Sequence, residues 1–313
     1  MTRAFVFPGQ GSQVVGMGRD LAEAFPVARH VFQEIDEALG QSLSRLMFEG
    51  PEDQLTLTEN AQPALMAVSL AVVRVMETEG GLDLAKAGAF VAGHSLGEYS
   101  ALAAAKTFTI SDTARLLKLR GQAMQKAVPV GVGAMAALLG ADFDQAVEIA
   151  AAAQQGEVCA AANDNAPGQV VVSGHKAAVE RAMAIATERG IKRAILLPVS
   201  APFHCSLMQP AADVMAEALA KVTMAVPNPS VVANVTALQV SDPATIRGLL
   251  VEQVTGTVRW RESVLFMKSQ GVDSIIELGA GKVLSGLAKR IDKDLTGQSI
   301  GTPADIDAFL KSL

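Results

Sequence analysis

The chain has 313 residues, half of them hydrophobic, with a mean hydropathy of +0.30 and a formal net charge of −6. This length allows one large or two modest domains, and the acidic balance argues against nucleic acid as a bulk partner. The apolar stretch 127–141, which has no charged residue, contains proline and glycines and is shorter than the ~18 residues that a membrane span needs. The N-terminus lacks a secretory pattern, since only a few apolar residues separate Arg3 from Pro8.

The two cysteines, Cys159 and Cys205, have neither the spacing of a metal site nor that of a disulfide framework. We expect Cys159 to pack as a small apolar residue. The composition as a whole predicts a soluble, cytoplasmic protein without a metal, and we expect it to be a monomer.

The N-terminal segment begins with a short buried strand, Ala4–Phe7, followed by a glycine-rich loop at 8–13. The glycine spacing matches neither a dinucleotide fingerprint nor a P-loop, so we reject a phosphate site. The loop either presents backbone N–H groups and the Gln10 side chain or is an ordinary strand-to-helix turn. Helical periodicity then covers two segments, Asp20–Leu39 and Asn60–Glu79.

An apolar run, 87–93, ends at a G-x-S-x-G turn made by Gly93, Ser95 and Gly97, and a helical pattern follows from Leu96 to Lys106. This order is typical of a nucleophile elbow, which lifts the serine oxygen into a cleft. Glycines are needed because the two backbones crowd at so tight a turn. The N–H of Leu96 is then placed to stabilise an oxyanion.

A second explanation of the same turn is purely structural. Ser95 and Glu98 form the S-x-x-E pattern of a capping box, which would only begin the helix. The strand before the turn and the helix after it favour the catalytic interpretation.

The next helix is expected over Ser111–Ala127, with Ser111 as its N-cap. Arg120 lies on its apolar stripe, with Leu116 and Met124. An inward arginine is costly unless an anion meets it. That anion is either an internal carboxylate, in a structural salt bridge, or an anionic group of a substrate, which a guanidinium binds through two parallel hydrogen bonds.

Residues 128–200 contain two β-α-β units. The expected elements are strand 133–139, helix 142–154, strand 157–162, strand 169–173, helix 176–189 and strand 193–199. This order is typical of a ferredoxin-like domain, inserted here between two segments of a larger domain, 1–127 and 201–313. The turn-rich stretch Asn163–Gly168 is expected to be a loop, with Asn163 at the rim of a cleft.

His204 lies in a proline-containing loop at the predicted domain junction, where clefts form. We expect His30 and His175 at the surface, and the side chain of His94 pointing away from Ser95. A lone histidine is more often structural, but His204 is the one good candidate for a general base, and serine before histidine is the order of α/β-hydrolases. No Asp or Glu stands out as the third member of a triad.

The remainder of the chain continues the alternation of helices and strands. The expected elements are helix 208–221, strand 231–235, helix 242–253, strand 274–279 and helix 283–291. They predict an α/β fold with a parallel sheet.

Six motifs stand in order along nearly the whole chain. They are Phe7–Gln13, Gly93–Tyr99, Leu119–Gly121, Asn163–Gly168, Ser200–Cys205 and Glu277–Leu284. Together they resemble those of the bacterial malonyl-CoA:acyl carrier protein transacylases, although Ala280 stands where many members have proline. The resemblance implies an α/β-hydrolase-like domain with a ferredoxin-like insert, and malonyl transfer for fatty acid synthesis.

The resemblance also implies roles for individual residues. Ser95 would be the nucleophile and His204 its base. Gln10 and Leu96 would supply the oxyanion-hole N–H groups, and Arg120 would hold the malonyl carboxylate.

Two further roles concern the surroundings of the base. A backbone carbonyl, at the position of Gln253, would orient the histidine in place of an acid. Phe203 is similar to the malonyl-selective pattern of related polyketide acyltransferases and would line the acyl pocket.

The implied reaction is ping-pong acyl transfer from malonyl-CoA to acyl carrier protein, without a cofactor. A serine thioesterase or hydrolase would share Ser95 and His204 without needing Arg120. A non-catalytic carrier-binding module would need none of them, and loading of a polyketide pathway is a further alternative. Because the base must be neutral, loading is expected to decline as the pH falls through the histidine range, near ~6.5.

An acidic carrier protein requires a local basic patch on this acidic chain. The candidates are Lys282, Lys289 and Arg290 near the closing helix, and Arg189, Lys192 and Arg193 where the insert returns. Each of them, taken singly, is better explained as a solvated surface charge.

Overall fold

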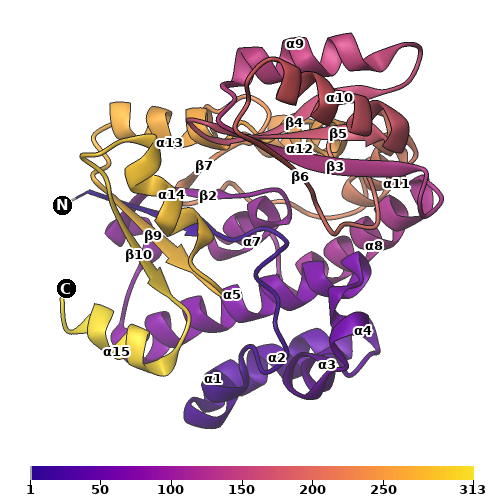
Figure 1. The fold of residues 1–313 in the computed structure, drawn as a ribbon. Helices are drawn as coiled ribbons and strands as arrows, with labels where there is room; N and C mark the ends of the chain where they lie inside the picture. Colours follow the sequence, from indigo (N-terminus) through magenta and orange to yellow (C-terminus); the bar gives the residue numbers. More distant parts are fainter. Residues whose placement is uncertain (1) are drawn as a thin grey trace.

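The computed structural model describes residues 2–313 and contains two β-sheets surrounded by helices (Figure 1). The strands are β1 (Arg3–Phe7), β2 (Gly88–Gly93), β3 (Gly133–Leu139), β4 (Cys159–Ala166), β5 (Gln169–His175), β6 (Arg193–Leu196), β7 (Ser230–Val232), β8 (Gln239–Val240), β9 (Ser274–Leu278) and β10 (Thr296–Ile300). The larger sheet has the order β10-β9-β1-β2-β7-β8, and its neighbours are parallel except for β7 and β8. This confirms the predicted parallel α/β sheet.

The helices fill the connections between these strands. They are α1 (Arg19–Ala24), α2 (Pro26–Leu39), α3 (Leu43–Glu49), α4 (Glu52–Thr56), α5 (Thr58–Gly80), α6 (Leu84–Ala87), α7 (Leu96–Ala104), α8 (Ile110–Ala127), α9 (Phe143–Gln154), α10 (Lys176–Glu188), a short 3₁₀ turn η1 (Ser206–Met208), α11 (Gln209–Leu219), α12 (Pro243–Thr255), α13 (Trp260–Ser269), α14 (Val283–Ile291) and α15 (Pro303–Leu310). Among the described residues, none of these helices has the length and apolar character to cross a membrane.

Side chains of the large sheet alternate between two cores, as the period of two along a strand requires. In β1, Phe5 and Phe7 belong to the core that α5, α7 and α8 share, whereas Ala4 and Val6 belong to the core beneath α13 and α14. Both faces are therefore covered, which is the usual condition of parallel strands.

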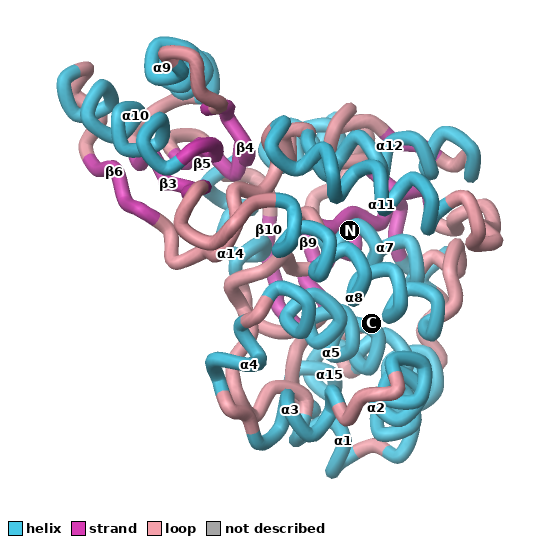
Figure 2. The backbone as a smooth tube through the Cα atoms, turned by 90° about the vertical axis from the view of Figure 1, so that its right-hand side faces the viewer, coloured by secondary structure: helices cyan, strands magenta, loops and turns pink. Residues whose placement is uncertain are grey.

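The smaller sheet is antiparallel, with the order β4-β5-β3-β6. Its chain order, β3-α9-β4-β5-α10-β6, is the predicted ferredoxin-like arrangement. Figure 2 shows this sheet at one edge of the molecule, with α9 and α10 on its outer side. The boundaries 1–127, 128–200 and 201–313 remain a prediction.

Strand β4 fastens the small sheet to the rest of the fold. Asn163 forms a parallel bridge with Val258, whose carbonyl accepts the Asp164 N–H at 2.9 Å. The buried Asp164 carboxylate also pairs with Arg261 of α13 at 2.8 Å.

The predicted loop Asn163–Gly168 is wrong, because β4 continues through Ala166 and leaves only Pro167 and Gly168 as the turn. Two irregularities in the pairing of β4 with β5 accommodate the Asn-Asp-Asn residues. The contacts with Val258 and Arg261 are distant in sequence, so local composition could not reveal them.

Two helix predictions also need correction. The predicted helix 20–39 is divided into α1 and α2, because Pro26 disfavours a helical conformation at Phe25, which is extended. The N-cap of α8 is Thr109, whose hydroxyl accepts the Asp112 N–H at 3.0 Å. Ser111 instead donates to Glu34 at 2.8 Å.

The predicted elements also lacked several that the structure contains. These are helices α3, α4, α13 and α15 and strand β10.

Candidate active site

Ser95 occupies the turn between β2 and α7, with φ 54° and ψ −113°. The flanking glycines make this turn possible. A Cβ on Gly93 would lie 1.9 Å from the backbone of Gly97, and a Cβ on Gly97 would lie 2.3 Å from the carbonyl of Phe7. The strained serine and its glycines have the geometry of the predicted nucleophile elbow.

His204 lies directly beside this serine. Ser95 Oγ is 2.8 Å from His204 Nε2, and His204 Nδ1 is 2.9 Å from the main-chain carbonyl of Gln253. The carbonyl can only accept, so Nδ1 carries the proton and leaves Nε2 free to accept from the serine. A backbone group thus holds the imidazole where many triads use a carboxylate.

Burial and, to a smaller extent, the charge of Arg120 together lower the pKa of His204 to about 3, against the opposing hydrogen bond to Gln253. The imidazole is therefore neutral, as a base must be, throughout the physiological range.

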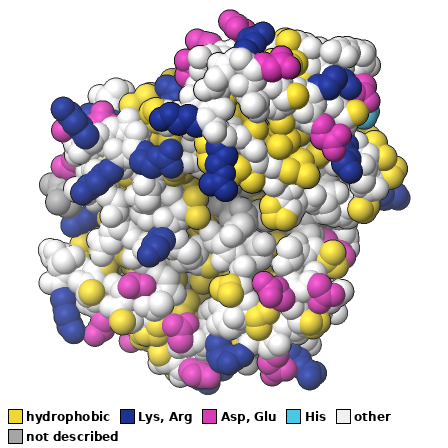
Figure 3. All heavy atoms as spheres, viewed as in Figure 1, with side chains coloured by type: hydrophobic (Ala, Val, Ile, Leu, Met, Phe, Trp, Pro, Cys, Tyr) yellow, Lys and Arg dark blue, Asp and Glu magenta, His cyan; other side chains and the backbone are white. Residues whose placement is uncertain are grey.

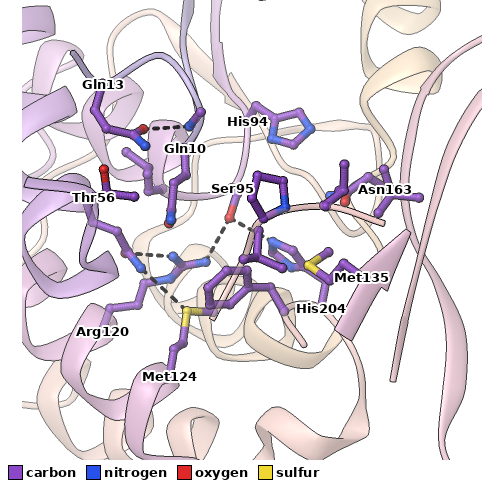
Figure 4. Close-up of a pocket in the computed structure, with 18 of the residues that line it drawn as sticks. Gln10, Gln13, Thr56, His94, Ser95, Arg120, Met124, Met135, Asn163 and His204 are labelled. Atoms are coloured by element: carbon purple, nitrogen blue, oxygen red, sulfur yellow. Dashed lines mark hydrogen bonds between the residues drawn. The ribbon is translucent and has the colours of Figure 1, made fainter. Parts of the chain in front are cut away.

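Arg120 reaches the same serine from α8 and is 1% exposed. Its Nη2 donates to Ser95 Oγ at 3.1 Å (Figure 4). Nη2 also donates to Gln253 Oε1 at 2.8 Å, while Nη1 donates to Gln62 Oε1 at 2.8 Å. These partners are uncharged, so the alternative of an internal salt bridge is wrong. A buried cation with only neutral partners is suited to an anionic ligand.

Two backbone N–H groups border the serine. Leu96 is the first residue of α7, where an N–H has no acceptor inside the helix. Gln10 lies in the turn after β1, and its side-chain carbonyl accepts from Thr58 at 2.8 Å. Both residues line the cleft with Ser95, and their predicted role in an oxyanion hole remains a prediction.

The cleft above Ser95 has a volume of about 500 Å³. Phe203 and Asn163, predicted for the acyl pocket and the rim, both line it. Leu197 and Val199 add apolar surface from the segment that follows β6. Figure 3 shows the hollow between the small sheet and the rest of the molecule.

His94 also lines the cleft, but its ring points away from Ser95 Oγ, as predicted (Figure 4). Its Nε2 lies 2.8 Å from Asn165 Oδ1 of β4. Burial lowers the pKa of His94, partly offset by that hydrogen bond. His30 is exposed and His175 half-buried, with its Nδ1 accepting from the Val158 N–H at 2.9 Å.

Sequence reasoning missed two polar residues at this site, Gln62 and Asn234. It also missed the contacts that Glu98 makes with the residues around Ser95. Asn234 Oδ1 accepts the Ser95 N–H at 2.8 Å, and its Nδ2 donates to the Gly93 carbonyl at 2.7 Å. Gln62 lies on an almost entirely buried stretch of α5, which resembled ordinary core. No local signal distinguishes these residues, because their partners are distant in sequence.

The predicted docking residues all lie at the surface, outside the cleft. Arg290 Nη1 donates to Gln169 Oε1 at 2.7 Å, which joins α14 to the start of β5. Gln169, Leu139 and Arg193 form one row across β5, β3 and β6, so the two predicted groups flank the same end of the small sheet. Lys and Arg side chains gather over α13 and α14 beside the hollow (Figure 3).

No group of three or more His, Cys, Asp or Glu residues within 2–313 has the arrangement of a metal site. Both cysteines are free and buried. Burial raises the pKa of the Cys159 thiol to about 11, which makes this residue an inert part of the core.

The family model described as "Acyl transferase domain" matches residues 4–292. The chain belongs to the acyl transferase family. Within this family it is 47% identical over 308 residues to the malonyl CoA-acyl carrier protein transacylase of Escherichia coli K12, with 98% of each chain covered.

Solved structures of the acyltransferase family agree with this assignment. The acyl-carrier-protein-S-malonyltransferase of Bartonella henselae is 55% identical, with a TM-score of 0.97 over 100% of this chain and 99% of that one. A malonyl-transacylase in complex with a type II polyketide acyl-carrier protein is 43% identical, with a TM-score of 0.96 and full coverage of both chains.

Proposed function

We propose that this acyltransferase moves a malonyl group from malonyl-CoA to the phosphopantetheine thiol of acyl carrier protein. The observation that carries the proposal is the buried Arg120 guanidinium, 3.1 Å from Ser95 Oγ. A cation at this distance selects an acyl group that ends in a carboxylate. The malonyl specificity in the names of its relatives supports the same substrate.

In the first half-reaction His204 Nε2 takes the proton of Ser95 as Oγ bonds to the thioester carbonyl carbon. The N–H groups of Gln10 and Leu96 bind the resulting oxyanion. The carbon–sulfur bond then breaks, and His204 returns its proton to the departing CoA thiolate. Arg120 holds the malonyl carboxylate, and Phe203 packs beside the acyl chain.

In the second half-reaction the carrier thiol gives its proton to His204 and its sulfur attacks the malonyl ester. The carbon–oxygen bond breaks and Ser95 regains a proton from His204. Neither half-reaction needs a metal or a redox cofactor. The cytoplasmic location and the monomeric state also stay proposals.

The test is the intact mass of the enzyme after mixing with malonyl-CoA, with and without holo carrier protein. We expect a malonyl adduct that carrier protein discharges into malonyl-carrier. An adduct lost to water at the same rate without carrier would instead identify a thioesterase. Offering fatty acid and polyketide carriers in parallel separates those two pathways, and the similarity to a malonyl-transacylase bound to a polyketide carrier is the reason to include the second carrier.

The pH profile of loading is expected to differ from the one predicted from the sequence. Because the pKa of His204 is about 3, its neutral form persists as the pH falls, and the rate should stay level from about pH 8 to about pH 5. Burial raises the pKa of Glu98 to about 7, so Glu98 itself titrates within this pH range. Single-turnover loading is therefore also measured in Glu98→Gln, in which position 98 no longer titrates. A decline centred near ~6.5 in both proteins would contradict the lowered pKa of His204.

Charge reversal on α14 is expected to weaken carrier binding alone. Lys289→Glu with Arg290→Glu should raise the carrier KM about three- to tenfold at low salt, and less at high salt, because exposed charges are screened. Loading by malonyl-CoA should stay nearly constant. The matched control reverses Arg45 of α3 and Lys311 of α15, which are also exposed. Equal losses in both half-reactions would exclude α14 as the docking surface.

A further inference from the structure

Glu98 has no part in the mechanism above, although it hydrogen-bonds two residues that contact Ser95, namely Asn234 and Gln253. The Ser95 side chain makes no capping hydrogen bond to α7, so the capping box that would explain both residues does not form. Glu98 is 1% exposed. A buried carboxylate is costly unless its hydrogen bonds compensate.

The hydrogen bonds of Glu98 all lead to residues that hold the catalytic groups. Its Oε2 accepts from Gln253 Nε2 at 2.7 Å and from the Asn234 N–H at 3.1 Å. Asn234 in turn holds the Ser95 N–H, and Gln253 Oε1 accepts from Arg120. Glu98 is therefore one side chain away from both the nucleophile and the guanidinium.

The amide of Gln253 can meet its neighbours in only one orientation. Arg120 has donors alone, so it requires the amide oxygen. Glu98 Oε2 and the carbonyl of Ser95 are acceptors, and each accepts a hydrogen bond from Gln253 Nε2, at 2.7 and 3.0 Å. The contact with Glu98 is the shorter of the two, and it is charge-assisted when Glu98 is ionised, which makes it the stronger restraint.

We propose that Glu98 is a positioning residue that fixes the side-chain amide of Gln253 with its oxygen toward Arg120, and so aims the guanidinium at the acyl carboxylate. This inference rests on the proposed function. It assigns Glu98 to the selection of the acyl group, through Gln253, and leaves the chemistry to Ser95 and His204.

The readout is the ratio of kcat/KM for malonyl-CoA to kcat/KM for acetyl-CoA, which has no carboxylate for Arg120 to hold. In Glu98→Met the acceptor is lost while the side-chain volume is nearly kept, and the ratio should fall about tenfold, through a higher KM for malonyl-CoA. Glu98→Gln keeps an amide oxygen for both donors, so its ratio should stay within about threefold of the wild type.

The matched control is Glu277→Met. Glu277 is also fully buried, but its hydrogen bonds go to Ser285 N and Oγ, both at 2.8 Å, away from the cleft. This variant should lower the melting temperature and leave the ratio unchanged. If Glu98→Met fails to fold, Gln253→Leu removes the same amide from the other side, keeps the main-chain carbonyl for His204, and should lower the ratio similarly.

Parallel losses for both acyl groups in Glu98→Met, or in Gln253→Leu, would overturn the inference, because they indicate a general structural role. A ratio in Glu98→Gln as low as in Glu98→Met would also overturn it. A wild-type protein that is never loaded by malonyl-CoA would overturn both this inference and the proposed function. Normal wild-type loading with an unchanged ratio in the variants would overturn this inference alone.

Discussion

Ser95→Ala is expected to abolish loading by malonyl-CoA, with a loss of at least about 10⁴-fold in kcat/KM. The hydroxyl 2.8 Å from His204 Nε2 is the atom that we propose to carry the acyl group. Without it the first half-reaction has no acyl acceptor, and the second has no acyl-enzyme for carrier protein to discharge. Intact mass measures the adduct, and carrier acylation measures the overall rate.

The matched control is Ser100→Ala, because Ser100 lies on the same helix, is buried, and has a hydroxyl without a hydrogen-bond partner among the described residues. It should keep normal loading. A malonyl adduct on the Ser95→Ala protein, or transfer within about tenfold of the wild type, would show that another group is the nucleophile.

Arg120→Ala should cost malonyl transfer about 2–4 kcal/mol, or roughly 30- to 1000-fold in kcat/KM. Acetyl transfer should suffer far less, since the acetyl group has no charge to lose a partner. Part of the loss reflects Gln62 and Gln253, whose amide oxygens are left unpaired in the cavity.

Arg120→Lys separates charge from geometry. Lysine keeps the positive charge but cannot form two parallel hydrogen bonds, so malonyl transfer should fall between the wild type and Arg120→Ala. Both acyl-CoAs are measured on all three proteins. Equal losses on malonyl and acetyl groups would mean that Arg120 only supports the fold.

The parts of the site that the sequence could predict are those with a local signature. The elbow at Ser95 is recognisable from a pattern of consecutive residues. The inward position of Arg120 follows from helical periodicity alone. His204 was reached by elimination among the histidines and by resemblance. The carbonyl of Gln253 came from the resemblance only, because any residue carries a carbonyl.

What the sequence could not predict are contacts made between distant segments. Glu98 looked like a capping residue, because its real partners are 136 and 155 positions away. The polar Asn163–Asn165 stretch looked like a loop, because Arg261, which neutralises Asp164, lies 97 positions further on. A polar side chain can be buried in this chain when a hydrogen-bonding or charged partner is present. Hydrophobic periodicity along the sequence cannot identify that partner.

Gln253 divides its contacts between backbone and side chain, since its carbonyl serves His204 and its amide serves Arg120. Any amino acid at this position supplies the carbonyl. Substitutions at position 253 therefore change the preference for the acyl group while His204 keeps its orientation. Mutational drift at position 253 could therefore broaden the range of acyl groups in a lineage that never loses a working nucleophile. For the same reason, position 253 is a rational starting point for engineering this enzyme to accept other acyl groups.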